Sequence, residues 1–200
     1  MNKNKKVSME YEARVMVNES QYLKIKQDYR NIGGICKEFT NINTYFDTPD
    51  LYLTSHHMVL RIREIITNDK SEKELTLKIK GENGDIEITH IIEDEIEYQN
   101  LFSINIDSKD ILEELSHRGI DPQKLKIVTT LTTERIEVNF SNYLLVIDKN
   151  FYNGKIDFNI EVESTSRELA KQYLIDVISK YDIEYKKDYI SKSRRAIYKL

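Results

Sequence analysis

Hydrophobic and polar residues alternate with a period of two along much of this chain, which is the pattern of β-strands with two different faces. Between these segments lie three stretches whose apolar residues recur every three or four positions, as they do along one side of a helix. The alternation predicts eight strands, near residues 8–17, 39–47, 58–66, 73–81, 85–98, 126–139, 143–150 and 155–163. The helical spacing predicts helices at 19–32, 108–118 and 166–181. We therefore expect an α+β protein built around one large sheet.

Local signals mark the ends of the predicted helices. Gly33-Gly34 ends the first helix and Gly119 the second, because glycine readily takes the left-handed conformation that terminates a helix. Thr165 and Glu168 have the spacing of a capping box at the start of the third helix. No internal repeat and no Pro- or Ser-rich linker divides the chain, so we expect a single domain over residues 1–200, with a short disordered arm at 1–6.

The polar faces of several predicted strands carry charges in pairs of one sign. The acidic pairs are Glu10/Glu12 and Glu161/Glu163, and the basic pairs are Arg61/Arg63 and Lys78/Lys80. Residues two apart on a strand point the same way, about 7 Å from one another. For any single strand, a solvated sheet face is the simpler interpretation. The set as a whole favours a barrel instead, because three amphipathic helices need an apolar sheet face to cover.

An eight-stranded sheet can close into a barrel just wide enough for side chains or one small ligand. With the helices outside, the charged faces would line its interior. A hard divalent cation takes oxygen ligands, mostly carboxylates, which the acidic pairs could supply. A polyphosphate needs fixed positive charges, preferably arginine forks, which the basic pairs and Arg135 could supply. An interior with both sets suits a triphosphate bridged by metal ions.

Composition narrows the possible partners and location. The net charge of −4 argues against a general nucleic-acid binder, which is usually basic. Cys36 is the only cysteine, so neither an intrachain disulfide nor a thiolate metal cluster can form, which fits a reducing cytoplasm. The longest apolar run, Tyr143 to Ile147, is far short of the roughly 20 residues that cross a bilayer. We expect a cytoplasmic protein with a small-molecule substrate and no membrane or nucleic-acid partner; its oligomeric state stays open, a homodimer included.

Five short motifs follow one another along the chain. They are Glu10-Tyr-Glu12-Ala-Arg14, Tyr45-Phe46-Asp47-Thr48, Leu60-Arg61-Ile62-Arg63, Leu75-Thr76-Leu77-Lys78 and Ile160-Glu161-Val162-Glu163. In this order they resemble the E-x-E-x-K, Y-[FY]-D-T, L-R-x-R, L-x-L-K and E-x-E motifs of the CYTH family of triphosphate tunnel metalloenzymes. Each motif alone is weak, but five in order over nearly the whole chain are specific. The resemblance implies a closed eight-stranded antiparallel barrel with helices packed outside.

The resemblance also implies roles for the matching residues. The ligands of Mg²⁺ or Mn²⁺ would be Glu10, Glu12, Glu161 and Glu163, with Asp148 as a further candidate. The phosphate-binding residues would be Arg14, Arg61, Arg63, Lys78 and Arg135, with Lys80 and Lys192 as further candidates. Another acidic residue of the tunnel would come from Glu93, Glu95 and Glu97, with Glu95 favoured.

The activity that the resemblance implies is metal-dependent hydrolysis of inorganic triphosphate or of an organic triphosphate. Two alternatives stay open. One is a class IV-type adenylate cyclase, which makes cyclic AMP from ATP. The other is a module that binds triphosphate or polyphosphate without catalysis.

Arg14 is the position where the chain departs from the family pattern, which has lysine there. An amine can shift its pKa and take part in proton transfer, whereas a guanidinium stays protonated. We expect position 14 to help handle the attacking water, which makes Arg14 the candidate catalytic residue, and we expect Arg14→Lys to raise turnover more than it changes substrate affinity. If it only grips phosphate, the replacement is harmless.

Other reactive side chains have simpler interpretations. His56 and His57 lie between two predicted strands and are expected to be solvated, and Cys36 is expected to be inert. The C-terminal basic residues are either an outer lip of the site or a solvated tail; they are Lys192, Arg194, Arg195 and Lys199.

Overall fold

The computed structural model describes residues 5–30, 36–68, 70–82, 84–92, 109–186 and 190–200. Its strands are β1 (Lys5–Val17), β2 (Cys36–Asp47), β3 (Met58–Ile66), β4 (Ser71–Ile79), β5 (Asp85–Ile92), β6 (Lys126–Asn139), β7 (Leu144–Tyr152) and β8 (Lys155–Ser164). Its helices are α1 (Glu19–Arg30), α2 (Tyr52–Ser55), α3 (Lys109–His117), α4 (Arg167–Ile178) and α5 (Lys192–Ile197), with 3₁₀ turns η2 (Pro122–Lys124) and η3 (Ser179–Tyr181). None of the helices in these ranges is long and apolar enough to cross a membrane.

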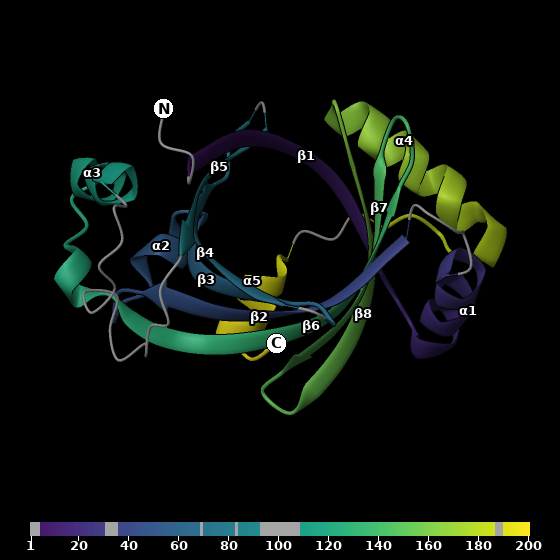
Figure 1. Cartoon of the computed structure of the whole chain (residues 1–200), viewed down its shortest axis with the longest axis horizontal. Helices are drawn as coiled ribbons and strands as arrows, with labels where there is room; N and C mark the ends of the chain where they lie inside the picture. The colour runs from purple at the N-terminus through teal and green to yellow at the C-terminus, as the bar shows by residue number, and fades with distance from the viewer. Residues whose placement is uncertain (1–4, 31–35, 69, 83, 93–108, 187–189) are drawn as a thin grey trace.

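The strands form one closed barrel in the order β1-β5-β4-β3-β2-β6-β7-β8, and every neighbouring pair is antiparallel. β1 closes the ring by dividing its length between two partners. Its first half pairs with β5 up to Glu10, and its second half pairs with β8 from Tyr11 onward. Figure 1 looks into the barrel and shows this strand arching over the opening. Closure leaves no long unpaired edge, so the backbone polar groups of the sheet are satisfied. The predicted fold is confirmed.

The hydrophobic cores lie outside the barrel, between the sheet and the helices. On one side α1 and α4 cover β1, β6, β7 and β8, where Ile25 and Leu174 are fully buried against Ile147 and Ile160. On the opposite side α2 and α3 cover β3 and β4, and Leu115 is fully buried; Figure 1 shows the two helical groups flanking the barrel. Leu115→Ala would cost about 2–5 kcal/mol of stability, as buried leucines typically do. Because the apolar strand faces point outward, the charged faces must point inward.

The ends of several elements differ from the prediction. β1 begins at Lys5, so the expected arm at 1–6 is wrong for its last two residues. The N-cap of α4 is Ser166, whose hydroxyl oxygen accepts from the Leu169 N–H at 3.2 Å, and Thr165 lies just before it. Gly119 has a φ of 72° behind α3, as its predicted role requires. The stop at Gly33-Gly34 and strand residues 93–98 lie outside the described residues.

The sequence pattern did not predict α2 and α5. They have four and six residues, so neither completes the two turns that a helical period needs to be visible. α2 depends on a tertiary cap instead. The buried carboxylate of Asp47 accepts from the backbone N–H groups of Leu53 and Thr54 at 2.8 and 2.9 Å, and from the Thr54 hydroxyl at 2.6 Å. The Tyr-Phe-Asp-Thr motif therefore holds α2 at the end of β2.

Candidate functional site

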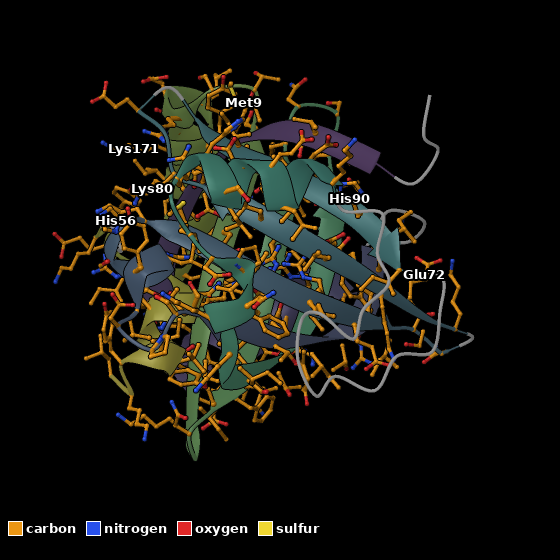
Figure 2. The ribbon with its side chains drawn as sticks, turned by 90° about the vertical axis from the view of Figure 1, so that its left-hand side faces the viewer. Met9, His56, Glu72, Lys80, His90 and Lys171 are labelled. Atoms are coloured by element: carbon orange, nitrogen blue, oxygen red, sulfur yellow. The ribbon has the colours of Figure 1, made fainter. Side chains whose placement is uncertain are left out.

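A cavity of about 270 Å³ lies inside the barrel. Its acidic lining residues are Glu10, Glu12, Asp85, Glu87, Glu161 and Glu163. Its basic lining residues are Arg14, Arg61, Arg63, Lys78, Lys80, Arg135, Arg167, Lys192 and Arg194. The lining therefore includes every predicted site residue in the described part of the chain except Asp148. Figure 2 shows that Lys80 and His56 lie toward one end of the barrel, and Glu72 toward the other.

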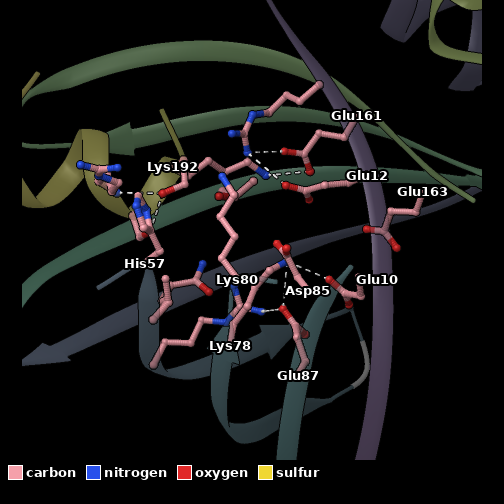
Figure 3. A pocket seen from close by; sticks show the side chains of 18 of the residues that line it. Glu10, Glu12, His57, Lys78, Lys80, Asp85, Glu87, Glu161, Glu163 and Lys192 are labelled. Atoms are coloured by element: carbon pink, nitrogen blue, oxygen red, sulfur yellow. Dashed lines mark hydrogen bonds and ion pairs between the residues drawn. The ribbon is translucent and has the colours of Figure 1, made fainter. Parts of the chain in front are cut away.

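The period of the strands sends these charges inward. On β8, Ile160 and Val162 are fully buried in the outer core, so Glu161 and Glu163 between and beyond them face the cavity. The labelled acids of β1 and β8 occupy one side of the cavity in Figure 3, and Lys78, Lys80 and His57 occupy the other. We call the side with Glu10, Glu12, Glu161 and Glu163 the acidic wall, and the side with Arg61, Arg63 and Lys78 the basic wall, where Asp85 and Glu87 lie beside Lys78.

The acidic wall has an excess of negative charge at one end. Glu12 and Glu163 lie directly opposite one another in the β1–β8 register. Glu163 makes no hydrogen bond or ion pair to any described residue, and burial together with Glu10 raises its pKa to about 7. Burial also raises the pKa of Glu10, although Lys78 partly opposes this. A bound cation would relieve the repulsion at this end.

At its other end, the same wall is compensated. The Glu161 carboxylate forms ion pairs with Arg14 Nη1 at 3.1 Å, Lys192 Nζ at 3.1 Å and Arg135 Nη2 at 3.5 Å. Burial would raise the pKa of Glu161, but Lys192, Arg14 and Arg135 outweigh burial and hold it below its ordinary value. Glu161 is therefore ionised and fully engaged before any ligand arrives.

Asp148 lies beneath the cavity, with no exposed surface. Arg135 holds it with a bidentate fork, from Nε and Nη2 at 2.9 Å each, and Lys192 Nζ also contacts it. Asn159 donates to it at 3.4 Å. This geometry favours a role as counter-ion of Arg135 and Lys192 over the role of metal ligand that the sequence suggested.

Lys78 is the centre of the basic wall. Its ammonium lies 3.0 Å from Glu10, 3.3 Å from Glu87 and 3.6 Å from Asp85. Burial opposes the charge on Lys78, but the carboxylates of Glu12, Glu87 and Glu10 outweigh it and raise the pKa. The lysine is therefore a fixed positive charge at any physiological pH.

Arg61 and Arg63 project from β3 beside Lys78. Arg61 reaches Glu87 at 3.8 Å, and Arg63 donates to Asn43 at 3.1 Å and reaches Glu74 at 3.4 Å. Burial and the neighbouring charge of Arg61 lower the pKa of Arg63 to about 10. An anion placed between the two guanidinium groups would reduce their mutual repulsion.

Sequence reasoning missed two acids of the cavity, Asp85 and Glu87. They have the same two-residue spacing as the recognised pairs and lie within a predicted strand, so the signal was present. Burial works against the charge on Glu87, but Arg61 and Lys78 outweigh burial and lower its pKa to about 2. The favoured residue, Glu95, lies outside the described residues with Glu93 and Glu97.

His56 and His57 are both exposed, as expected. His56 stacks on Tyr52 with ring centroids 3.8 Å apart. His57 has a left-handed φ of 56° and lines the mouth of the cavity, and its carbonyl accepts from the Lys80 N–H at 3.1 Å. The turn at His57 thus fixes the backbone of Lys80, the residue directly after β4.

The acidic wall fits a divalent cation in its donor chemistry, since Mg²⁺ and Mn²⁺ prefer carboxylate oxygens. The observation that supports this fit is Glu163, whose carboxylate has no ion pair with a described residue and whose pKa is raised to about 7 by burial and Glu10. Across the described ranges, however, no three such side chains are already gathered closely enough to enclose an ion. A cation would therefore draw the carboxylates together.

Comparisons with known proteins give a consistent result. The model of the family described as CYTH domain matches residues 8–197. The Bacillus subtilis (strain 168) protein named "Putative triphosphatase YjbK" is 28% identical over 163 residues, which are 79% of this chain and 82% of that protein.

Two solved structures have the same fold. One, described as a "putative adenylate cyclase" from Bacillus halodurans, has a TM-score of 0.71 at 24% identity, covering 94% of this chain and 97% of that one. The other is HpAC1 from Hippeastrum, described as a "putative adenylyl cyclase" that "reveals a dominant triphophatase activity". Its TM-score is 0.66 at 20% identity, covering 94% of each chain.

Proposed function

Because this chain belongs to the CYTH domain family, we propose that it hydrolyses a triphosphate, with divalent metal ions, inside its barrel. The observation that carries the proposal is the cavity itself, where arginines and lysines for phosphate oxygens face carboxylates for a cation. The name of the Bacillus subtilis relative, "Putative triphosphatase YjbK", supports the same chemistry. Cytoplasmic location and the lack of a nucleic-acid partner stay predictions from the sequence, and the oligomeric state stays open.

Substrate binding would be an exchange of partners. Arg61, Lys78 and Arg135 each pair with a carboxylate of the barrel before substrate arrives. Phosphate oxygens would take over these cations, and Arg63 would add a second fork beside Arg61. Lys80 and Lys192, at the mouth and at the acidic wall, would complete the set. Positive charges fixed in this way stabilise the charge on a transferring phosphoryl group without reorganisation.

The metal ions would be held by Glu163, which has no ion pair with a described residue, together with Glu10 and Glu12, and with Glu161 adjoining. Lys78 and Arg14, which now lie 3.0 Å from Glu10 and 3.9 Å from Glu12, would turn to phosphate oxygens. When bound, such a cation neutralises phosphate charge and lowers the pKa of water, which makes water a better nucleophile. Either Mg²⁺ or Mn²⁺ suits the all-oxygen donor set.

The reaction itself is a displacement at the terminal phosphorus. A bond forms between the water oxygen and that phosphorus, the bond to the bridging oxygen breaks, and the water proton is released. The products are orthophosphate and the shortened phosphate chain. In this scheme the barrel residues orient the phosphates and keep the reacting groups aligned, which is the main contribution that a protein makes to phosphoryl transfer.

The test is phosphate release from a panel of inorganic, thiamine and nucleoside triphosphates, each with Mg²⁺ and with Mn²⁺. We expect orthophosphate from at least one of them, lost in Arg61→Met and retained in Arg118→Met, which removes an exposed pair with Glu114 on α3. Pyrophosphate together with cyclic AMP would replace the proposal with a cyclase. Metal-dependent binding without turnover would replace it with a binding module.

A further inference from the structure

The basic residues at the C-terminus occupy several different environments. Lys192 points into the cavity and contacts Glu161 and Asp148. Arg194 lines the mouth, Arg195 is buried, and Lys199 is exposed. The expectation of one outer lip or one solvated tail is therefore wrong, because the side chains of α5 face different parts of the barrel and Lys199 lies beyond the end of the helix.

α5 needs anchors outside itself. A helix of six residues is too short to be stable from its own hydrogen bonds. Ser191 caps it, with its hydroxyl oxygen accepting from the Arg194 N–H at 3.3 Å. One cap cannot hold so short a helix by itself, so further contacts with the barrel must hold the helix and the lysine that it carries.

Asp157 of β8 supplies the first anchor. Arg195 donates to both of its carboxylate oxygens, from Nε at 2.9 Å and from Nη2 at 3.3 Å. Tyr152 and Asn150 donate to the same carboxylate at 2.5 and 2.9 Å, so its position is fixed from β7 as well. The remaining arm of Arg195, Nη1, donates to the backbone carbonyl of Ile190 at 2.9 Å.

Arg14 supplies the second anchor, from β1. Its Nη1 is bound to Glu161, and its Nη2 donates to the same Ile190 carbonyl at 3.3 Å. Two guanidinium groups from distant parts of the chain thus converge on one carbonyl, two residues before Lys192. A lysine at position 14 has one nitrogen and could not span Glu161 and the carbonyl as a planar fork does.

We propose that Arg14 and the Asp157–Arg195 pair are positioning residues for the proposed hydrolysis. By holding the Ile190 carbonyl from two sides, they keep Lys192 in the cavity at Glu161, within reach of substrate phosphates. The proposal rests on the proposed function for its catalytic consequence. It gives a physical reason for arginine at the position where the family pattern has lysine.

The experiment is a double-mutant cycle between Arg195→Met and Lys192→Met. For wild type, both single variants and the double variant, kcat and KM are measured with inorganic triphosphate and Mg²⁺. Misplacing a binding group by about 1 Å can cost about 10²-fold in rate, so we expect a loss of up to that size in Arg195→Met. In the Lys192→Met background the same change should cost little more, because residues that act through one another are not additive. Equal losses in both backgrounds would overturn the proposal.

Arg195→Lys and Lys155→Met complete the set. Arg195→Lys restores a charge opposite Asp157 and should recover part of the loss. Lys155→Met removes a contact with the Lys199 carbonyl beyond the end of α5 and should leave kcat and KM unchanged. If Arg195→Met does not fold, Asp157→Asn keeps the shape of the anchor and takes its place in the cycle.

Hydrogen exchange gives a readout that does not depend on turnover. We expect the amides of residues 190–197 to exchange faster in Arg195→Met and in Arg14→Lys than in wild type, with the outer helices unchanged. If wild type releases no phosphate, the proposed function fails while this measurement still tests the anchors. Unchanged exchange in both variants would show that the two arginines do not hold the segment.

Discussion

Two neighbouring regions of the cavity, centred on Glu161 and Glu163, are charged in opposite ways although both residues lie on one face of β8. Around Glu161 the positive groups of Arg14, Arg135 and Lys192 converge. Around Glu163, Glu10 and Glu12 add negative charge that Lys78 and Arg14 balance only in part. Burial alone cannot explain the difference, because both carboxylates are largely buried. The balance of positive and negative side chains around each carboxylate explains why the pKa of Glu161 is lowered and that of Glu163 is raised.

This contrast separates two tasks of a binding site. The Glu161 region is complete without ligand and behaves as part of the framework. The Glu163 region is strained without ligand, and it gains most from a cation. If the comparison holds, substitutions in the first region should destabilise the fold, and those in the second should stabilise the empty protein while impairing metal binding.

Arg135→Met should produce the largest change in stability. It leaves Asp148 buried without its bidentate partner, and breaking a buried ion pair typically costs about 3–5 kcal/mol. Urea unfolding at pH 7 measures this cost. Arg118→Met, on an exposed i,i+4 pair, is the control and should change stability by at most about 0.5 kcal/mol. A similarly small loss in Arg135→Met would remove the distinction between the two regions.

Glu163→Gln should stabilise the metal-free protein, and only at high pH. The pKa of Glu163 is raised from 4.5 to about 7 in the folded state, so the native protein holds this proton more tightly than the unfolded chain. Stability should therefore fall as pH rises through this window, by up to about 3 kcal/mol in total. Glutamine should recover this amount at pH 8 and change nothing at pH 4, as measured by urea unfolding. Equal stabilisation at both pH values would contradict the electrostatic explanation.

Glu12→Gln should weaken cation binding with little loss of fold. It keeps the size of the side chain but removes the charge that a hard cation needs, so we expect about 10–100-fold weaker Mn²⁺ binding by calorimetry in the presence of triphosphate. Glu134→Gln, on the exposed outer face of β6, is the matched control. Full metal-dependent activity in both Glu12→Gln and Glu161→Gln would refute the assignment of the acidic wall to metal.

Arg14→Lys should have the smallest effect. Lysine at position 14 should keep the contact with Glu161 but lose the hydrogen bond to the Ile190 carbonyl. We expect kcat/KM to fall by less than about tenfold, or about 1.4 kcal/mol, because Arg195 still donates to that carbonyl. Steady-state kinetics on the best triphosphate of the panel checks this. An increase in kcat would instead support the interpretation that position 14 transfers a proton.

The barrel could be predicted because its signal is local. Each strand shows the period-two alternation in its own sequence, without reference to its neighbours. A pair of like charges two residues apart, such as Arg61/Arg63, is enough to identify a charged face of the strand. The pattern therefore predicts charged side chains in the interior without knowledge of which strands pair. Short elements such as α2 had no comparable signal, because their stability comes from Asp47 rather than from their own sequence.

The roles of individual acids could not be predicted in the same way. Whether a carboxylate serves a cation or a neighbouring base depends on what lies across the strand. Asp148 faces Arg135 in the β6–β7 register, and Glu12 faces Glu163 in the β1–β8 register. Both acids look alike in the sequence, and only the pairing of distant strands separates them. Arg195 was hidden for the same reason, since its partner Asp157 lies 38 residues away.

The divided pairing of β1 has a consequence for the order in which the protein can be made. Within the barrel β1 is synthesised before β8, so its second half has no partner until β8 is made, and Arg14 and Glu161 are 147 residues apart. Contacts of such long range form late and slow the folding of a domain. The acidic wall is assembled by this same closing step, so a nascent chain that stops before residue 161 has neither a closed barrel nor a complete wall. Acquiring the site and finishing the fold are one event.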